Sequence, residues 1–294
     1  MKKDRIYMDY NIYTKLANEE IFIPNRYYEY AKVYISVAHV EEFYNAKEND
    51  KKGDNKAQLD EIRLLFTKKL NNSGILNPQI KGRIINKKEL FDECLERVSM
   101  FDTRKNIEDS AVILHKMNKD KFAELRKKDI NAMNNSNCSI QEIWDRNEVV
   151  EGLSGFSERI KLNNNYSFDI LKEIYGDSSA AYLSKFKIRD FTLERGLFRG
   201  ERPDFKELEL TIEFLQELLN ACGYYSDKNQ RTTKSGIYDT EHAIYATYCT
   251  YFVTDDKNLR NRLDAIYFYL GISTKCISYN EWCENLKRLI KEKV

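Results

Sequence analysis

The sequence predicts an α/β protein with a parallel sheet flanked by helices, formed from both ends of the chain, and a mostly helical insertion between them. Short apolar runs typical of buried strands occur near the start, at residues 5–8 and 33–36, and near the end, at 251–254 and 275–278. Each precedes a segment with helical spacing. Between residues 50 and 230 strand-like runs are few, and apolar residues recur at helical spacing instead.

The amino-terminal part contains two strand–helix pairs. The first strand ends at Asp9 and leads into a short helix from Asn11 to Ala17, and the second, from Val33 to Ser36, leads into a helix over 37–47. A polar, charged linker begins at about Asn49. Helical segments are expected beyond it, each with an apolar stripe: Leu59, Ile62, Leu65, Phe66 and Leu70; then Leu90, Phe91, Cys94, Leu95 and Val98; then Ile140, Ile143 and Trp144; then Leu208 to Leu219.

The carboxy-terminal part returns to α/β spacing. We expect a helix over 239–249, a buried strand to Thr254, a helix over 257–270 that Gly271 caps, a strand over 275–278 and a last helix over 280–292. Neither end holds enough strands to form a sheet alone. The predicted domains are therefore a discontinuous core, residues 1–48 with 232–294, and a helical insertion, residues 49–231.

Composition limits the classes of partner. The chain has 48 basic and 47 acidic residues among 294, a net charge of +1, so contact with nucleic acid would depend on local patches. No apolar run approaches the roughly 20 residues that span a bilayer, and the first residues do not resemble a signal peptide. Six scattered cysteines without a Cys-x-x-Cys motif predict reduced thiols. We expect a cytoplasmic protein with no membrane partner.

Four acidic residues mark the predicted sheet: Asp9, Glu42, Asp239 and Asp256. Each lies at the end of an apolar run or in the first turns of the next helix, at the sheet edge where α/β proteins bind ligands. Carboxylates within about 5 Å repel by roughly 3 kcal/mol per pair at an effective dielectric near 20. A cluster therefore needs a cation or raised pKa values. Mg²⁺ or Mn²⁺ prefers such oxygen ligands and can activate a water for phosphodiester hydrolysis.

Taken singly, these acids have a simpler explanation. An acidic residue after a strand is often a helix N-cap that needs no metal, which is the interpretation we favour for Asp239 or Asp255 alone. The four together favour metal-dependent catalysis.

Their order along the chain resembles the PIN-domain nucleases, the group that includes the VapC-type toxins. That pattern is an Asp that closes the first strand, a Ser-x-x-x-x-x-Glu after the second, an Asp that opens a later helix, and a Thr-x-Asp after the next strand. The matches here are Asp9, Ser36 to Glu42, Asp239 and Thr254 to Asp256. Phe43 stands where the family usually has Leu. The resemblance covers roughly residues 4–48 and 232–280.

The resemblance implies a metal-dependent endoribonuclease that holds one or two Mg²⁺ or Mn²⁺ ions and acts on single-stranded or structured RNA in preference to DNA. A toxin, a defence system or RNA processing would be its setting. The alternative is a catalytically inactive PIN-like protein that binds RNA or a protein partner. A homodimer or an inhibitory partner protein is left open.

Two assignments are ambiguous by one position. Glu42 is favoured over Glu41 because it shares a helix face with His39, and Asp256 is favoured over Asp255 from the Thr-x-Asp spacing. His39 and His242 each lie one turn from a proposed ligand, so they are catalytic candidates that orient the carboxylates, contact the phosphate or carry protons. Packing beneath the site is the equal alternative.

Several residues are expected to contact the substrate. They are Lys15, Thr254, Lys257, Arg231 and Lys234. A second basic stretch, Lys185 to Arg202, contains phenylalanines, and there we favour a solvated loop over an RNA-binding surface.

Overall fold

The computed structural model describes residues 3–78, 83–100, 135–161, 191–200, 203–226 and 233–291. Its centre is a six-stranded sheet in the order β4-β3-β2-β1-β5-β6. Neighbouring strands are parallel except for the antiparallel pair β3 and β4. The strands are β1 (Asp4–Met8), β2 (Ala31–Ser36), β3 (Ile75–Asn77), β4 (Ile85–Lys87), β5 (Tyr251–Val253) and β6 (Lys275–Ile277).

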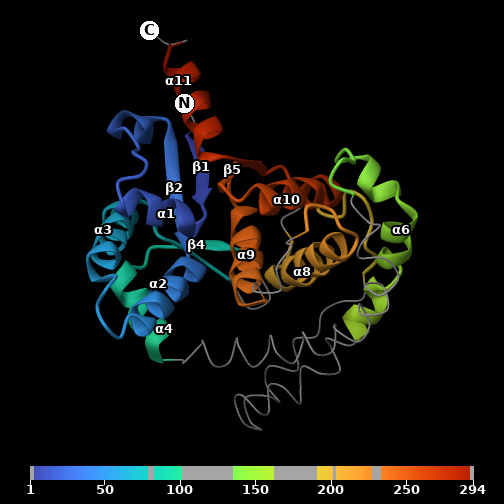
Figure 1. Ribbon diagram of the computed structural model, residues 1–294, viewed down its shortest axis with the longest axis horizontal. Helices are drawn as coiled ribbons and strands as arrows, with labels where there is room; N and C mark the ends of the chain where they lie inside the picture. The colour runs from blue at the N-terminus through green and yellow to red at the C-terminus, as the bar shows by residue number, and fades with distance from the viewer. Residues whose placement is uncertain are drawn as a thin grey trace.

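Helices cover both faces of this sheet (Figure 1). Helices α1, α2, α3, α4 and α11 pack with one apolar core, whereas α8, α9 and α10 pack with the other. Their bounds are α1 (Tyr10–Ala17), η1 (Asn25–Glu29), α2 (Val37–Asn49), α3 (Lys56–Ser73), α4 (Phe91–Met100), η2 (Glu142–Asp145), α6 (Asn147–Leu153), α8 (Phe205–Ala221), α9 (Thr233–Ala246), α10 (Lys257–Leu270) and α11 (Tyr279–Lys291).

Strand β1 lies at the centre and is buried on both sides. Ile6 and Met8 belong to one core and Tyr7 to the other, as the alternation of side chains along a strand requires. Such burial on both faces is typical of central strands in parallel sheets. The three parallel neighbours β2, β1 and β5 therefore end side by side, and the residues that follow them meet at one edge.

The predicted α/β class and the shared sheet are confirmed. Strands β1 and β2 from the start of the chain lie beside β5 and β6 from its end. Gly271 closes α10 in the left-handed conformation, with φ of 76°, as expected for a C-cap. All six cysteines are free thiols, and the described residues contain no helix of the length and apolarity that a membrane span requires.

The interval between residues 49 and 231 contributes two strands as well as helices. Helices α3, α4 and α8 occupy three of the predicted stripes and the short η2 lies at the fourth, while β3 and β4 extend the main sheet next to β2. These strands read Ile-Leu-Asn and Ile-Asn-Lys, so they contain fewer apolar residues than the runs before Asp9 and Thr254 and do not stand out as buried strands. Residues 101–134 and 162–190 of this interval, with the first part of the Lys185–Arg202 stretch, lie outside the described residues.

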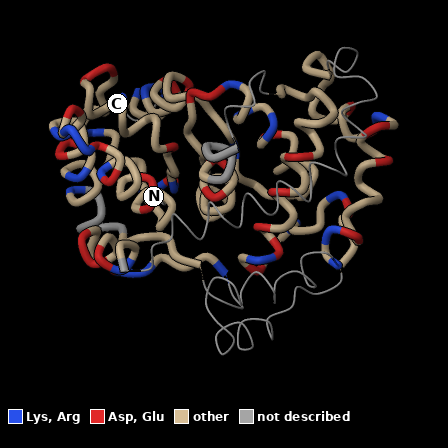
Figure 2. Tube along the Cα trace, turned by 60° about the horizontal axis from the view of Figure 1, so that its bottom comes forward, with Lys and Arg blue, Asp and Glu red and all other residues tan. Residues whose placement is uncertain are grey.

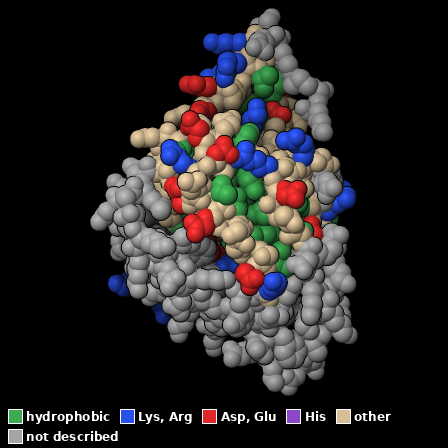
Figure 3. Space-filling view, turned by 90° about the vertical axis from the view of Figure 1, so that its right-hand side faces the viewer, with side chains coloured by type: hydrophobic (Ala, Val, Ile, Leu, Met, Phe, Trp, Pro, Cys, Tyr) green, Lys and Arg blue, Asp and Glu red, His purple; other side chains and the backbone are tan. Residues whose placement is uncertain are grey.

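Charge is spread over the molecule. Acidic and basic residues are interspersed over the described trace (Figure 2), in keeping with the net charge of +1. The face that includes α6 carries a group of apolar side chains bordered by charged ones (Figure 3). Of the acidic residues singled out by the sequence, Asp9 and Asp256 follow β1 and β5, whereas Glu42 and Asp239 lie in α2 and α9.

Candidate active site

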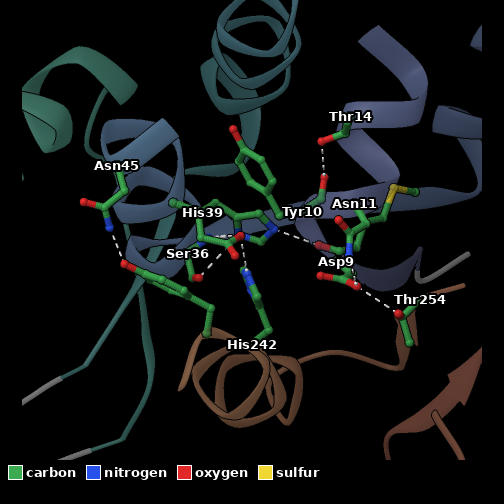
Figure 4. Close-up of polar contacts among 12 residues, drawn as sticks. Asp9, Tyr10, Asn11, Thr14, Ser36, His39, Asn45, His242 and Thr254 are labelled. Atoms are coloured by element: carbon green, nitrogen blue, oxygen red, sulfur yellow. Dashed lines mark hydrogen bonds and ion pairs between the residues drawn. The ribbon is translucent and has the colours of Figure 1, made fainter. Parts of the chain in front are cut away.

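The site forms where β1, β2 and β5 end and where α9 packs against β1, β5 and α2. Asp9 is the residue after β1 and is only 3% exposed. Its backbone N–H donates to the Val253 carbonyl at 2.9 Å, which joins the ends of β1 and β5. Its Oδ2 accepts a hydrogen bond from Thr254 Oγ1 at 2.9 Å (Figure 4). Asp9 precedes α1 without capping it through its side chain, so the carboxylate has no capping role.

Asp256 and Asp255 follow Thr254 and have different partners. Asp256 Oδ1 accepts from the Leu259 N–H at 2.9 Å and so caps α10, while the Asp256 N–H donates to Thr254 Oγ1 at 3.1 Å. Asp255 uses both oxygens elsewhere: Lys15 Nζ lies 2.6 Å from Oδ2, and the Tyr279 N–H donates to Oδ1 at 3.1 Å. Because Asp255 is engaged elsewhere and the charge of Asp256 acts on Asp239, Asp256 is the better candidate of the two.

Glu42, a residue of α2, is held by a histidine of α9. His242, which is 1% exposed, places Nε2 at 2.9 Å from Glu42 Oε2. Glu41, one position away, lies near Glu241 of α9, and burial followed by the charge of Glu41 raises the pKa of Glu241. Glu42 is therefore the better candidate of the pair.

Asp239 differs from its expected position. Helix α9 begins at Thr233, so Asp239 lies inside the helix and does not open it. The N-cap explanation is therefore wrong for Asp239. The spacing of three residues places it beside His242 on the helix surface.

The other three acids act on Asp239 electrostatically. Burial first, then the charge of Asp9, and then the charges of Asp256 and Glu42 together raise the pKa of Asp239 to about 8. His242 opposes this effect. Burial alone would lower the pKa of His242, but the charge and hydrogen bond of Glu42 outweigh burial and raise it. The charges of three acids from three other elements thus act on Asp239.

His39 has a different environment from His242. It is fully buried, its Nε2 donates to the Met8 carbonyl at 2.7 Å, and its Nδ1 accepts from the Ser36 N–H at 3.1 Å. Burial, followed by the neighbouring His242, lowers the pKa of His39 well below its ordinary value. A neutral ring with both nitrogens bound to backbone fastens α2 to the end of β1, which favours the packing alternative over contact with phosphate.

The donor set can be compared with the needs of a metal ion. Within the described parts of the chain, no three carboxylate, imidazole or thiolate groups are arranged to hold an ion together. The converging groups are nevertheless carboxylate oxygens, which hard divalent cations prefer. Mg²⁺ usually binds through one or two carboxylates and keeps several waters. The residues therefore fit a hydrated Mg²⁺ or Mn²⁺ held by a few of these acids better than a closed protein cage.

The predicted substrate contacts are distributed unevenly. Lys257 is exposed at the start of α10, beside Asp256, whereas Lys15 is paired with Asp255. Thr254 is fully buried and organises Asp9 and Asp256 instead of facing a substrate. Arg231 and the side chain of Lys234 lie outside the described residues.

One residue of the site was not predicted. The Tyr7 hydroxyl lies 2.7 Å from His242 Nδ1 and 2.6 Å from Ser36 Oγ. The sequence signal for Tyr7 was a side chain with a polar tip in an otherwise apolar strand, two residues before Asp9.

Comparison of the chain with known protein families, with curated proteins and with solved structures gives no match.

Proposed function

We propose that the protein is a PIN-like, metal-dependent nuclease that hydrolyses phosphodiester bonds, with RNA as the favoured substrate. The observation that supports this most is the meeting of Asp9, Glu42, Asp239 and Asp256 from four elements at one edge of the sheet. Asp9 and Glu42 are held by the neutral donor Thr254 and by His242. Such preorganised acids are what a catalytic metal requires.

Each residue of the site has its own role in the proposed reaction. Asp9, Glu42, Asp239 and Asp256 would hold one or two Mg²⁺ or Mn²⁺ ions, which supply an activated water and offset phosphate charge when bound. Thr254 fixes Asp9 and Asp256 relative to each other, because its hydroxyl donates to the Asp9 carboxylate and accepts from the Asp256 N–H. Lys257 is placed to contact the phosphate backbone. The preference for RNA comes from the resemblance of the four motifs to PIN-domain nucleases.

The test uses a labelled single-stranded RNA and the DNA of the same sequence, each with Mn²⁺, Mg²⁺ or EDTA. We expect the wild type to cut RNA only with metal, and Asp9→Asn to reduce the cleavage rate at least about 100-fold, because catalytic carboxylates contribute on this scale. Asp256→Asn should also reduce it while it keeps the α10 cap, since Asn is a good N-cap.

Asp255→Asn is the matched control. It changes the neighbouring acid, which holds Lys15 and the Tyr279 N–H, and it should leave the metal-dependent rate near wild type. Unaltered cleavage by Asp9→Asn would refute the site. If the wild-type protein binds RNA but cuts neither nucleic acid with either metal, the inactive RNA-binding alternative replaces the nuclease.

A further inference from the structure

A line of buried hydrogen bonds runs from Glu42 into the core beneath the site. Glu42 Oε2 meets His242 Nε2 at 2.9 Å, and His242 Nδ1 meets the Tyr7 hydroxyl at 2.7 Å. The Tyr7 hydroxyl lies 2.6 Å from Ser36 Oγ, which is 3.4 Å from His39 Nδ1. His242, Tyr7, Ser36 and His39 are all 0–1% exposed. Three of these residues appear together with Asp9 in Figure 4.

At the His39 end of this line, the donor and the acceptor of each backbone hydrogen bond are fixed. The Met8 carbonyl can only accept, so His39 Nε2 carries a hydrogen. The Ser36 N–H can only donate, so His39 Nδ1 is an acceptor. His39 is thus a neutral ring in one tautomer, fastened to the backbone at both nitrogens. The line therefore ends on a rigid support.

Tyr7 connects that support to the site. It lies on the central strand β1, whose pairing with β2 and β5 fixes its backbone. Its ring packs against both histidine rings, with centroids 4.8 Å from His39 and 5.6 Å from His242. Among the described residues, the Tyr7 hydroxyl is the hydrogen-bond partner of His242 Nδ1. A histidine ring that lacks this bond can turn over and present carbon, in place of Nε2, to Glu42.

We propose that Tyr7 is a positioning residue for Glu42: its hydroxyl fixes the ring of His242 so that Nε2 holds the Glu42 carboxylate at the sheet edge. The importance of Glu42 as a metal ligand rests on the proposed function, whereas the orientation of His242 does not. Partners of this kind set the orientation of metal ligands, and their loss typically lowers metal affinity or activity by about 10–100-fold.

The first experiment observes the histidine rings without metal or substrate. The chain has three histidines, so protein labelled with ¹⁵N-histidine gives few imidazole signals, which single His→Gln variants assign. We expect Tyr7→Phe to shift both ring-nitrogen resonances of His242 and to leave His39 as the tautomer with hydrogen on Nε2.

Tyr267→Phe is the matched control. Tyr267 is 1% exposed, and its hydroxyl donates to the carbonyl of Ala243, the residue after His242 on α9. This variant therefore removes a buried tyrosine hydroxyl from the same helix without touching the line to Glu42. It should lower the melting temperature about as much as Tyr7→Phe and leave the His242 resonances in place. Unshifted His242 resonances in Tyr7→Phe would overturn the proposal.

The second experiment measures Mn²⁺ affinity by calorimetry and the kinetics of RNA cleavage. Tyr7→Phe should weaken Mn²⁺ binding or lower kcat by about 10-fold, within the range given above, with KM for RNA unchanged. In a Glu42→Gln background, Tyr7→Phe should add less than about a twofold effect, because two residues that act through one contact are not additive. A full additive loss in that background would show that Tyr7 acts through general stability and would overturn the proposal.

The two proposals fail in different ways. A wild-type protein that neither binds Mn²⁺ nor cuts RNA would contradict the nuclease function. Displaced His242 resonances in Tyr7→Phe would still support the positioning of Glu42 in that case, because this readout needs no metal.

Discussion

Replacing Asp239 by Asn should stabilise the metal-free protein while it removes the response to metal. The carboxyl of Asp239 lies among Asp9, Glu42 and Asp256, and burial together with these charges raises its pKa to about 8 from an ordinary 3.8. The folded state therefore binds the Asp239 proton more tightly than the unfolded state does. Between these two pKa values the unfolded state gains from ionisation and the folded state does not, so wild-type stability falls as pH rises from about 4 to about 8.

The size of the effect follows from the same pKa. Each pH unit between the two values costs about 1.4 kcal/mol, which gives about 4 kcal/mol at pH 7 for full burial. Asp239 retains some exposed surface, so solvent screening reduces this to about 2 kcal/mol. For a chain of this size, 1 kcal/mol corresponds to about 2 °C. We expect Asp239→Asn to melt about 4 °C above wild type at pH 7 in EDTA, with a smaller difference at pH 5.

Thermal unfolding with EDTA and with Mn²⁺ is the assay. Mn²⁺ at about 100 times its Kd should stabilise the wild type by about 2.7 kcal/mol, and Asp239→Asn should lose most of that gain. Asp255→Asn is the control: it breaks the contacts with Lys15 and the Tyr279 N–H, so it should lower the melting temperature and keep the Mn²⁺ response. If Asp239→Asn melts lower than wild type in EDTA, or keeps the full Mn²⁺ shift, the acids do not share one site.

Two further predictions concern the surroundings of the acids. Thr254→Val keeps the side-chain shape but removes the donor to Asp9 Oδ2 and the acceptor of the Asp256 N–H, so kcat with Mn²⁺ should fall about 10-fold; an unchanged kcat would assign Thr254 to packing alone. Lys257→Ala should weaken RNA binding and reduce the slope of log affinity against log salt by about 1, measured by fluorescence anisotropy. Lys15→Ala should change the slope less, because Lys15 already pairs with Asp255, and equal slopes for the two variants would contradict the placement of RNA beside Lys257.

The sequence predicts the strands that carry the acids because their signals are local. The run before Asp9 and the run before Thr254 are short, apolar and followed by helical spacing, and the structure forms β1 and β5 there. The same pattern does not identify β3 and β4, which contain two apolar residues and one, respectively. Their pairing with β2 depends on contacts between distant segments, which a local pattern does not contain.

The choice between neighbouring acids required side-chain contacts. Spacing favoured Asp256 over Asp255, but the two share the same local sequence, and their difference appears only when Lys15 and the Tyr279 N–H engage Asp255. Tyr7 was missed for a related reason. A tyrosine in a buried strand looks like an aromatic core residue until the positions of His242 and Ser36 show what its hydroxyl binds.

The contacts of the site also explain why metal is expected to precede substrate. Asp9 is held by the hydroxyl of Thr254, Lys15 pairs with Asp255, Arg260 donates to the Thr254 carbonyl, and Lys257 is exposed beside Asp256. Burial, and then the charge of Asp9, raise the pKa of Asp239, and His242 acts against them. An RNA phosphate that approached these acids alone would add to the repulsion. In the proposed nuclease a divalent cation would reverse the sign of the local charge, so the arrangement that is unfavourable in the metal-free protein would then hold phosphate.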